Sequence, residues 1–428
     1  MRSSRIRQLC AALLVCAVAV AVAACGSSSN KSSSNTTASG GGNAASSDAV
    51  LGTPKAASGT PVLFGMVNLA TNPAVNFPEL QSAVEATVKY VNAYKGGING
   101  HPIKVDVCPT DGQPATTAKC ANKLVAEKPV AILGGADIAG AAAFPIYQRA
   151  KLAYIGGANI TPAENTAPNS VIFNDMAQSD NVGLGTYAVE KLGAKKVSII
   201  PVGDNQGKFQ AASYIAPGVA AKGGQSKTFP LPPSQADASP VVASALNYKP
   251  DAIILESPSQ CVALLNALKS LGNTKPVLSI DPCSAPNVIQ ATNGAAENMY
   301  YFSSYQLYEG DTADAKLARA IVAKYAPAKQ VIDSPALQGM NTVMNVWDAF
   351  KDTDPSKLTT DYILKTLRSG TDHTNFLSTP YTCDGKAVPA LPAICNAKYY
   401  INQIKNGKPT TVAQGYDTGA SILKLPQG

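Results

Sequence analysis

Short apolar runs alternate with helix-like segments from about Pro61 to the end of the chain. The run 62–67 predicts a strand, and the segment 76–94 places its apolar side chains on one face of a helix: Leu80, Ala83, Val84, Val88 and Val91. Gly96 and Gly97 predict the end of that helix, because glycine accepts the left-handed conformation of a helix C-cap. The run 103–107 then predicts the next strand, which completes a β-α-β unit.

The same alternation continues through both halves of the chain. Further strands are predicted near 130–134, 152–156, 196–200, 251–256 and 276–280, and helices near 114–127, 139–149, 180–192, after Gly207, and over 260–271. Strands that alternate with helices indicate parallel sheets covered on both faces. The predicted fold class is therefore α/β, with two doubly wound parallel-sheet lobes.

The first 59 residues predict an export signal and a tether. Residues 1–24 carry three arginines and an apolar run that ends in small residues before Cys25, as in a secretory signal. The sequence Val-Ala-Ala-Cys resembles a bacterial lipobox, which implies lipidation of Cys25. Residues 25–59 are rich in Ser, Gly, Asn and Ala and predict a disordered tether. We therefore expect a lipid-anchored protein in the cell envelope, on the outer face of the cytoplasmic membrane.

Charge and cysteine content narrow the range of partners. The formal charge of +7 falls to +4 once the three arginines leave with the signal, and the remaining basic residues are scattered, so nucleic acid is not an expected partner. Six of the nine cysteines remain in the exported body, and an even number there favours disulfides over a metal site. Fifteen pairings are possible. Local spacing suggests Cys108 with Cys120, Cys261 with Cys283, and Cys383 with Cys395.

Small and polar residues gather where the predicted strands end. They occupy 68–72, 135–137, 156–159, 203–207, 256–257 and position 281. In open parallel sheets the ligand lies beyond the carboxyl ends of the strands. Each loop alone fits a helix cap or a turn, but their recurrence in both lobes predicts a shared cleft.

The chain from about Pro61 resembles the type I periplasmic binding proteins, particularly the branched-chain amino acid group of ABC-transporter receptors. The likeness rests on VNAYKGGINGHPIKVDVCPTDGQP, CANKLV, AFPIYQRAKLAYIGGANITP and GDNQGK. The resemblance implies three hinge crossovers, expected near residues 175, 303 and 396. The first lobe would then comprise 60–175 and 304–395, and the second 176–303 and 396–428.

The resemblance also suggests ligand-binding positions in the first lobe. The aromatic at the start of the first helix aligns with Asn76 or Phe77. The loop that usually offers a serine to an amino acid carboxylate carries Asp137 and Ile138 instead. The next loop aligns with residues that include Ala158, Asn159 and Thr161.

In the second lobe the candidates are mostly acidic. The acid after the first crossover aligns with Ser179 or Asp180, and a shortened turn without its usual tyrosine offers Asp204 and Gln206; Glu256 and Asp281 end two later strands. Because Asp137 brings its own negative charge to a helix N-terminus, we expect a polar, neutral or cationic solute such as an amide, urea-like compound or polyol. Leucine, isoleucine and valine are disfavoured.

The predicted function is solute capture for an ABC importer, by a monomer without cofactor or metal. A ligand-sensing or adhesion lipoprotein is the alternative, and neighbouring permease and ATPase genes would favour uptake. Enzyme activity is not expected, because no Gly-x-Ser-x-Gly motif occurs and both histidines, His101 and His373, lie in predicted loops. The phosphate-loop-like segment 203–208 is one residue short and has Phe209 where Ser or Thr is required.

Overall fold

The computed structural model describes residues 49–423 except 74 and 177, and it contains two β-sheets. The first sheet has the order β2-β1-β3-β4-β5, and all its strands are parallel. We call this sheet with its helices the first lobe. Its strands are β1 (Val62–Leu69), β2 (Ile103–Thr110), β3 (Ala131–Leu133), β4 (Tyr154–Ile155) and β5 (Ser170–Val171).

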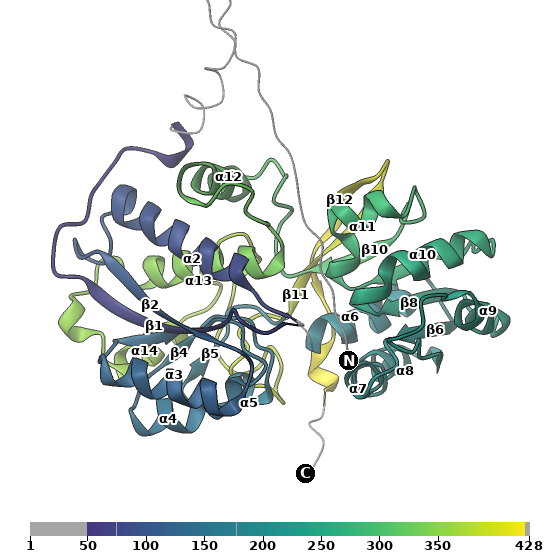
Figure 1. Cartoon of the computed structure of the whole chain (residues 1–428), viewed down its shortest axis with the longest axis horizontal. Helices are drawn as coiled ribbons and strands as arrows, with labels where there is room; N and C mark the ends of the chain where they lie inside the picture. Colours follow the sequence, from purple (N-terminus) through teal and green to yellow (C-terminus); the bar gives the residue numbers. More distant parts are fainter. Residues whose placement is uncertain (1–48, 74, 177, 424–428) are drawn as a thin grey trace, which may run out of the picture. The chain divides into compact units, whose positions relative to one another are not determined.

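Helices from two distant parts of the chain belong to the first lobe. The early ones are α2 (Pro78–Tyr90) with its continuation η1 (Val91–Lys95), α3 (Pro114–Ala126), η2 (Gly140–Ala142), α4 (Phe144–Arg149) and α5 (Pro162–Thr166). The late ones are α12 (Ala313–Tyr325), α13 (Ser334–Phe350), η6 (Pro355–Lys357) and α14 (Thr360–Arg368). Helices α12 and α13 pack against α2 (Figure 1). A side chain at Gly339 of α13 would come within 2.7 Å of the Leu80 carbonyl oxygen, so glycine permits this close approach.

The second sheet, with its helices, forms the second lobe and has the order β12-β11-β10-β9-β8-β6-β7. Its strands are β6 (Lys196–Pro201), β7 (Gln225–Thr228), β8 (Ala252–Glu256), β9 (Val277–Ser279), β10 (Tyr300–Ser303), β11 (Lys398–Lys405) and β12 (Lys408–Asp417). Its helices are α6 (Gln178–Glu190), α7 (Asn205–Gln210), η3 (Ala211–Ile215), α8 (Ala216–Ala221), α9 (Ser239–Asn247), η4 (Pro258–Gln260), α10 (Cys261–Ser270), η5 (Asp281–Ser284), α11 (Pro286–Ala291) and η7 (Ala420–Ile422). Strands β8 and β6 lie fully inside this sheet, and residues 252–256 are all buried.

One strand of the second sheet, β11, runs antiparallel to the others. Strand β11 pairs with β10 and β12 in antiparallel register (Figure 1). Asn406 and Gly407 join β11 to β12 with φ angles of 52° and 68°, the left-handed pair that a two-residue hairpin requires. Alternation of strands and helices does not predict this hairpin, whereas the Asn-Gly pair does.

Each strand and helix predicted within residues 62–280 is present, with small shifts at the element ends, but α5, β5, β7 and α9 were not predicted. The first helix ends as predicted, because Gly96 has a φ of 74°.

Residues 51–59 correct the prediction of an unfolded tether up to residue 59. Leu51 is 2% exposed. The backbone N–H groups of Lys55 and Ala57 donate to helix carbonyls at 3.0 and 2.8 Å. The folded body thus begins near residue 51; the predicted signal and Cys25 lie outside the described residues.

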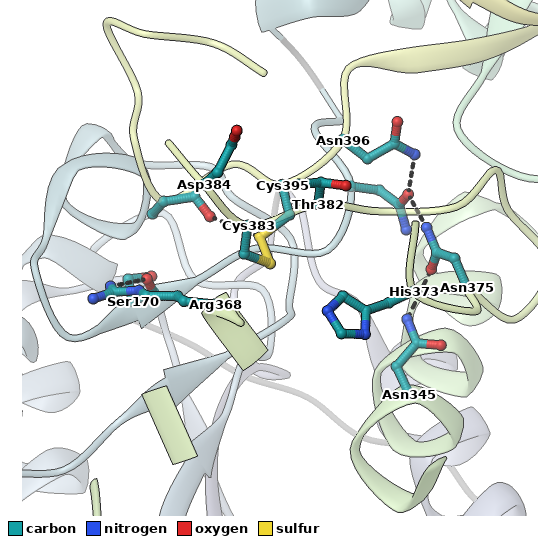
Figure 2. The surroundings of a disulfide bond; sticks show 12 residues. Ser170, Asn345, Arg368, His373, Asn375, Thr382, Cys383, Asp384, Cys395 and Asn396 are labelled. Atoms are coloured by element: carbon teal, nitrogen blue, oxygen red, sulfur yellow. Dashed lines mark hydrogen bonds between the residues drawn. A yellow bond between two sulfur atoms is a disulfide. The ribbon is translucent and has the colours of Figure 1, made fainter. Parts of the chain in front are cut away.

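The chain passes between the two sheets at three places, and a network of buried amides joins them. Asn174, which follows β5, accepts hydrogen bonds from Asn375 and from Asn396, which precedes β11, at 2.9 and 3.0 Å. Asn375 in turn accepts from Asn341 and Asn345 of α13 at 2.7 and 2.8 Å (Figure 2). All five side chains are at most 4% exposed. Such a satisfied network fixes the relative position of the segments that it joins.

The structure pairs the six cysteines of the body as the spacing suggested. Disulfides join Cys108 with Cys120, Cys261 with Cys283, and Cys383 with Cys395. Figure 2 shows the last of these beside the amide network. Among the described residues, no helix has the length and apolar character needed to cross a membrane.

Candidate ligand-binding site

Three carboxylates lie at one edge of the second sheet. Asp180 is in the first turn of α6, Glu256 is the last residue of β8, and Asp281 follows β9 as the first residue of η5. Asp180 and Glu256 are 6% and 4% exposed, and Asp281 is half-buried. Parallel strands bring such strand-end residues to the same edge, where ligands bind in open α/β sheets.

Burial and mutual repulsion favour the protonated form of these acids. Burial raises the pKa of the Glu256 carboxyl to about 8, with a smaller contribution from Asp204. Burial also raises the pKa of Asp281 to about 6, to which Asp333 adds. For Asp180, burial comes first and the charge of Asp281 second, and its pKa lies well above the usual range. Asp281 and Glu256, which the sequence analysis assigned to the same cleft as Asp180, thus both raise the pKa of Asp180.

No cation of the described chain neutralises the cluster. In residues 49–423, with 74 and 177 excepted, none of the three carboxylates forms an ion pair. Asp180 Oδ1 and Glu256 Oε2 are buried and lack a hydrogen-bond partner within the same residues. Within this described part, no group of three or more His, Cys, Asp or Glu side chains has the geometry to hold a metal ion. The arrangement is suited to a ligand that brings N–H or O–H donors.

Asp137 of the first lobe has a full set of donors from its own lobe. Its Oδ2 accepts from the hydroxyls of Thr110 and Thr117 at 3.0 and 2.7 Å, and its Oδ1 accepts from the Ala139 N–H at 2.8 Å. Asp137 is 4% exposed. Its charge also raises the pKa of the nearby Glu164, for which burial is the main cause. The structure thus places Asp137 as a buried acceptor that holds the loop after β3, and a ligand carboxylate would be repelled there.

The other first-lobe candidates near α2 and β3 differ in exposure. Asn76 is exposed, and its side-chain amide donates to the Asn72 carbonyl at 3.1 Å. Phe77 is half-buried, and its N–H donates to the Leu69 carbonyl at 2.9 Å. Ile138 is 46% exposed, which makes it available for contact with a ligand or with the other lobe.

Four candidates act in the framework around the first crossover. The amide of Asn159 donates to Asp175 at 2.7 Å, and the N–H of Ser179 donates to the other oxygen of Asp175 at 2.7 Å. The Thr161 N–H bonds to Glu164, and the Ala158 N–H donates to the Gly135 carbonyl at 3.0 Å. Asn159, Ser179 and Ala158 use these groups within the protein, whereas the buried Thr161 Oγ1 has no hydrogen-bond partner among the described residues.

Asp204 and Gln206 lie at the solvent-exposed end of β6. Asp204 caps α7 by accepting from the Gly207 N–H at 2.8 Å, and Gln206 is exposed. Asp204 contributes to the raised pKa of Glu256, so it lies close enough to act on the cluster. We regard these two residues as the rim of the site.

A cavity of about 460 Å³ lies at the same end of β8 but does not include the carboxylates. It is lined by residues 233–236, 259–260 and 262–263. Gln260 there already donates to the Pro232 and Gln235 carbonyls at 3.0 and 3.1 Å. Because the Gln260 amide is already hydrogen-bonded within the protein, this cavity offers few free polar groups to orient a ligand. The acid cluster is therefore the stronger candidate site.

Residues of α13 also reach this site, and the sequence-based prediction missed them. The Ser334 hydroxyl at the start of α13 donates to Asp281, which joins the two lobes directly. The sequence Asp333-Ser334-Pro335 carries a helix start signal, an acidic N-cap followed by proline, that would have located α13. The sequence-based candidates were chosen mainly at the ends of strands, and α13 does not follow a strand directly.

Comparison with known proteins identifies the family. A family model described as periplasmic binding protein matches residues 64–409. The chain belongs to this family. A search of curated proteins gave no match.

Solved structures of ABC-transporter binding proteins share the fold. A leucine-binding protein from Thermotoga maritima is 18% identical, with a TM-score of 0.62 over 82% of this chain and 98% of the other. A fatty acid ABC transporter substrate-binding protein from Thermomonospora curvata is 19% identical, with a TM-score of 0.67 over 86% and 95%. A solute-binding protein from Rhodopseudomonas palustris, in complex with p-hydroxybenzoic acid, is 17% identical, with a TM-score of 0.66 over 84% and 99%. The chain, a periplasmic binding protein by family, thus shares its fold with these three solute-binding proteins.

Proposed function

We propose that this protein captures a small solute rich in N–H or O–H donors, neutral or cationic, between its two lobes and delivers it to an ABC permease. The observation that carries the proposal is the acid cluster of Asp180, Glu256 and Asp281, which has no cation partner in the described chain. A buried acceptor without a donor costs about 1–3 kcal/mol. A ligand that brings donors removes that cost. A cationic ligand also favours the ionised form of these acids, whose protons it displaces, and then adds Coulomb attraction in a site that excludes water.

The chemistry of the first lobe supports the same solute class. Leucine, a fatty acid and p-hydroxybenzoic acid, the solutes named for the three similar structures, each carry a carboxyl group. In this chain Asp137, in the loop after β3, already accepts hydrogen bonds from the hydroxyls of Thr110 and Thr117 and from the Ala139 N–H. We infer that a free carboxylate is not the group recognised here.

We infer that capture proceeds by hinge closure. The proposed lobes are residues 60–175 with 304–395 and residues 176–303 with 396–428; the change of sheet between β5 and β6, after β10 and before β11 supports these limits. A solute that touches both lobes stabilises the closed state, because the open state offers only part of its contacts. A monomer suffices for this mechanism.

A thermal-shift panel on the full chain tests the proposed solute class. Methylguanidinium, methylammonium, acetamide, urea and glycerol form the donor-rich arm, and leucine and p-hydroxybenzoate form the carboxylate arm. Binding to the native state raises the midpoint temperature, so we expect a rise with members of the first arm that is absent in Glu256→Gln. A rise with the carboxylate arm alone would contradict the proposal.

We also propose that the protein is a lipoprotein anchored through Cys25 to the outer face of the cytoplasmic membrane. The support is the sequence Val22-Ala23-Ala24-Cys25 after an apolar run. The multi-chain lipid that such a motif implies anchors stably, whereas a single acyl chain holds weakly. In cell fractionation, we expect Cys25→Ser to leave the membrane fraction. Retention equal to that of the wild type would contradict the anchor.

A further inference from the structure

Helix α13 of the first lobe begins against the acid cluster of the second. The Ser334 hydroxyl donates to Asp281 Oδ2. The preceding residue, Asp333, is the N-cap of α13, and its charge contributes to the raised pKa of Asp281. Two independent relations therefore place the first turn of α13 beside Asp281.

Gln338 lies one turn further along the same face of α13. Residues four apart on a helix are neighbours, with Cβ atoms roughly 5–6 Å apart, so Gln338 stands next to Ser334. Its side chain is 3% exposed, and its Nε2 donates to the Gly157 carbonyl at the end of β4. Its Oε1 is buried and has no hydrogen-bond partner in the described residues.

We propose that the first two turns of α13 form a wall of the ligand site, in which Gln338 Oε1 accepts a hydrogen bond from the solute. This inference rests on the proposed function. The Gly157 bond fixes the amide so that Nε2 faces the first lobe, which leaves Oε1 as the free acceptor. Ser334 ties the same face of the helix to Asp281.

The inference narrows the solute class. Among the buried acceptor atoms without a partner in the described chain, three belong to the acid cluster and the proposed wall: Gln338 Oε1 from the first lobe, and Asp180 Oδ1 and Glu256 Oε2 from the second. A solute that satisfies all three needs at least three N–H or O–H donors. Guanidinium and amidinium groups, with several N–H bonds, meet this condition, and an N-alkylated group of equal charge does not.

Titration calorimetry of the full chain with methylguanidinium and tetramethylguanidinium tests the acceptor. Loss of a hydrogen bond to a charged group lowers affinity by roughly ten- to hundredfold. We expect that loss for methylguanidinium in Gln338→Met, and weak binding of tetramethylguanidinium to both proteins. Gln330→Met is the matched control, because Gln330 Oε1 is also buried without a partner, yet its Nε2 donates to the Glu79 carbonyl outside α13. Equal affinity in wild type and Gln338→Met would overturn the inference.

A second measurement needs no ligand and guards against a folding defect. In Gln338→Glu a new carboxylate joins Asp180 and Asp333, the charged groups that already face Asp281 from α6 and α13. We expect the apparent pKa of the Asp281 carboxyl, followed by NMR, to rise in Gln338→Glu and to stay constant in Gln330→Glu. An unchanged Asp281 titration in Gln338→Glu would overturn the inference. Absence of methylguanidinium binding to the wild type, together with a raised Asp281 pKa, would count against the proposed solute and not against the wall.

Discussion

Asp137 shows how one side chain decides which ligands a loop can accept. The resemblance placed it where family members offer a serine, and sequence alone left helix capping and ligand contact open. The three hydrogen bonds to Thr110, Thr117 and Ala139 assign it to the protein itself. The same bonds explain why an acid is tolerated at a buried position, since a buried polar group is costly only when it lacks hydrogen-bond partners.

Replacement of Asp137 is therefore expected to destabilise the first lobe. Asp137→Ala leaves the buried Thr117 hydroxyl without its acceptor and leaves the Thr110 hydroxyl only the Asn68 carbonyl at 3.3 Å, which costs about 1–3 kcal/mol. Asp237→Ala is the control, because Asp237 accepts the same kind of local bond from the Ser239 N–H at the surface. Differential scanning calorimetry should show a large fall in midpoint temperature for the first variant and a small one for the second. In calorimetric titration, micromolar leucine binding to the wild type that is unchanged in Asp137→Ser would refute the assignment.

Glu256 makes the stability of the empty protein depend on pH. Its folded pKa of about 8 exceeds the unfolded value of 4.5, so the folded state binds the proton more tightly. Stability from this group is full below about pH 4.5 and is lost as pH rises towards 8. We expect the midpoint temperature to fall over this window, and Glu256→Gln to flatten the decline and stabilise the protein at pH 8.

The control for Glu256 is an acid whose pKa is shifted the other way. Ion pairing with Lys222 and Lys191 holds the pKa of the exposed Glu190 below its usual range. Glu190→Gln should leave the decline between pH 4.5 and 8 intact. If Glu256→Gln and Glu190→Gln gave the same pH profile, Glu256 would not carry the effect.

At the scale of elements, α13 links the ligand site to the hinge. Its first turn carries Ser334 to Asp281 of the acid cluster, and its later turns carry Asn341 and Asn345 into the amide network. Because a packed helix moves as a unit, a displacement of α13 would change both the contact with Asp281 and the amide network.

Asn375 is the centre of the amide network and should be its most sensitive position. It accepts from Asn341 and Asn345 and donates to Asn174 and to the Thr379 carbonyl, all between 2.7 and 2.9 Å. Asn375→Leu leaves these groups buried and unpaired, so we expect a loss of stability of about 3–5 kcal/mol in denaturant melts. Asn122→Leu, at an exposed helix position with one local bond, should stay within about 0.5 kcal/mol. A small effect at Asn375 would show that the network is not a unit.

Sequence predicted the elements whose signal is local. Alternation located most strands and helices of residues 62–280 but missed α5, β5, β7 and α9, and glycine located the end of the first helix at Gly96. It missed the β11–β12 hairpin, because a pattern rule for parallel sheets does not address a strand that returns from the other lobe. For the candidate site, the strand-end positions pointed to Glu256 and Asp281 and the family resemblance pointed to Asp180, whereas the position of Gln338 depends on how α13 packs, which no local pattern encodes.

At the scale of the whole molecule, the two lobes differ in whether their buried acids have partners within the protein. The first lobe satisfies Asp137 internally, whereas the second presents carboxylates without a cation partner among the described residues. A solute that completes the second lobe and touches α13 stabilises the arrangement in which Ser334 meets Asp281. Under the proposed function, solute binding and hinge closure are coupled. The solute supplies the donors that the carboxylates of the second lobe lack, and the first lobe closes over it.

Two of the disulfides join cysteines at equal separations along the chain, so comparing them distinguishes a contribution to stability from a role at the hinge. Cys108–Cys120 and Cys383–Cys395 each span 12 residues, so in the chain-entropy model each stabilises the body by a similar amount, about 3 kcal/mol. Their places differ. Cys395 adjoins Asn396 of the third crossover, and its N–H donates to the Ile172 carbonyl of the first at 2.8 Å, while its carbonyl accepts from Thr382 at 3.1 Å.

Paired Cys→Ser variants at the two disulfides should thus melt at similarly lowered temperatures but behave differently at the hinge. In native-state hydrogen exchange, we expect the amides of Cys395 or its serine replacement and of Thr382 to lose protection in the Cys383→Ser, Cys395→Ser protein. The Cys108→Ser, Cys120→Ser protein should keep it, because that bridge joins β2 to α3 away from the crossovers. Equal protection of these amides in both variants would show that the bridge stabilises the fold without holding the hinge.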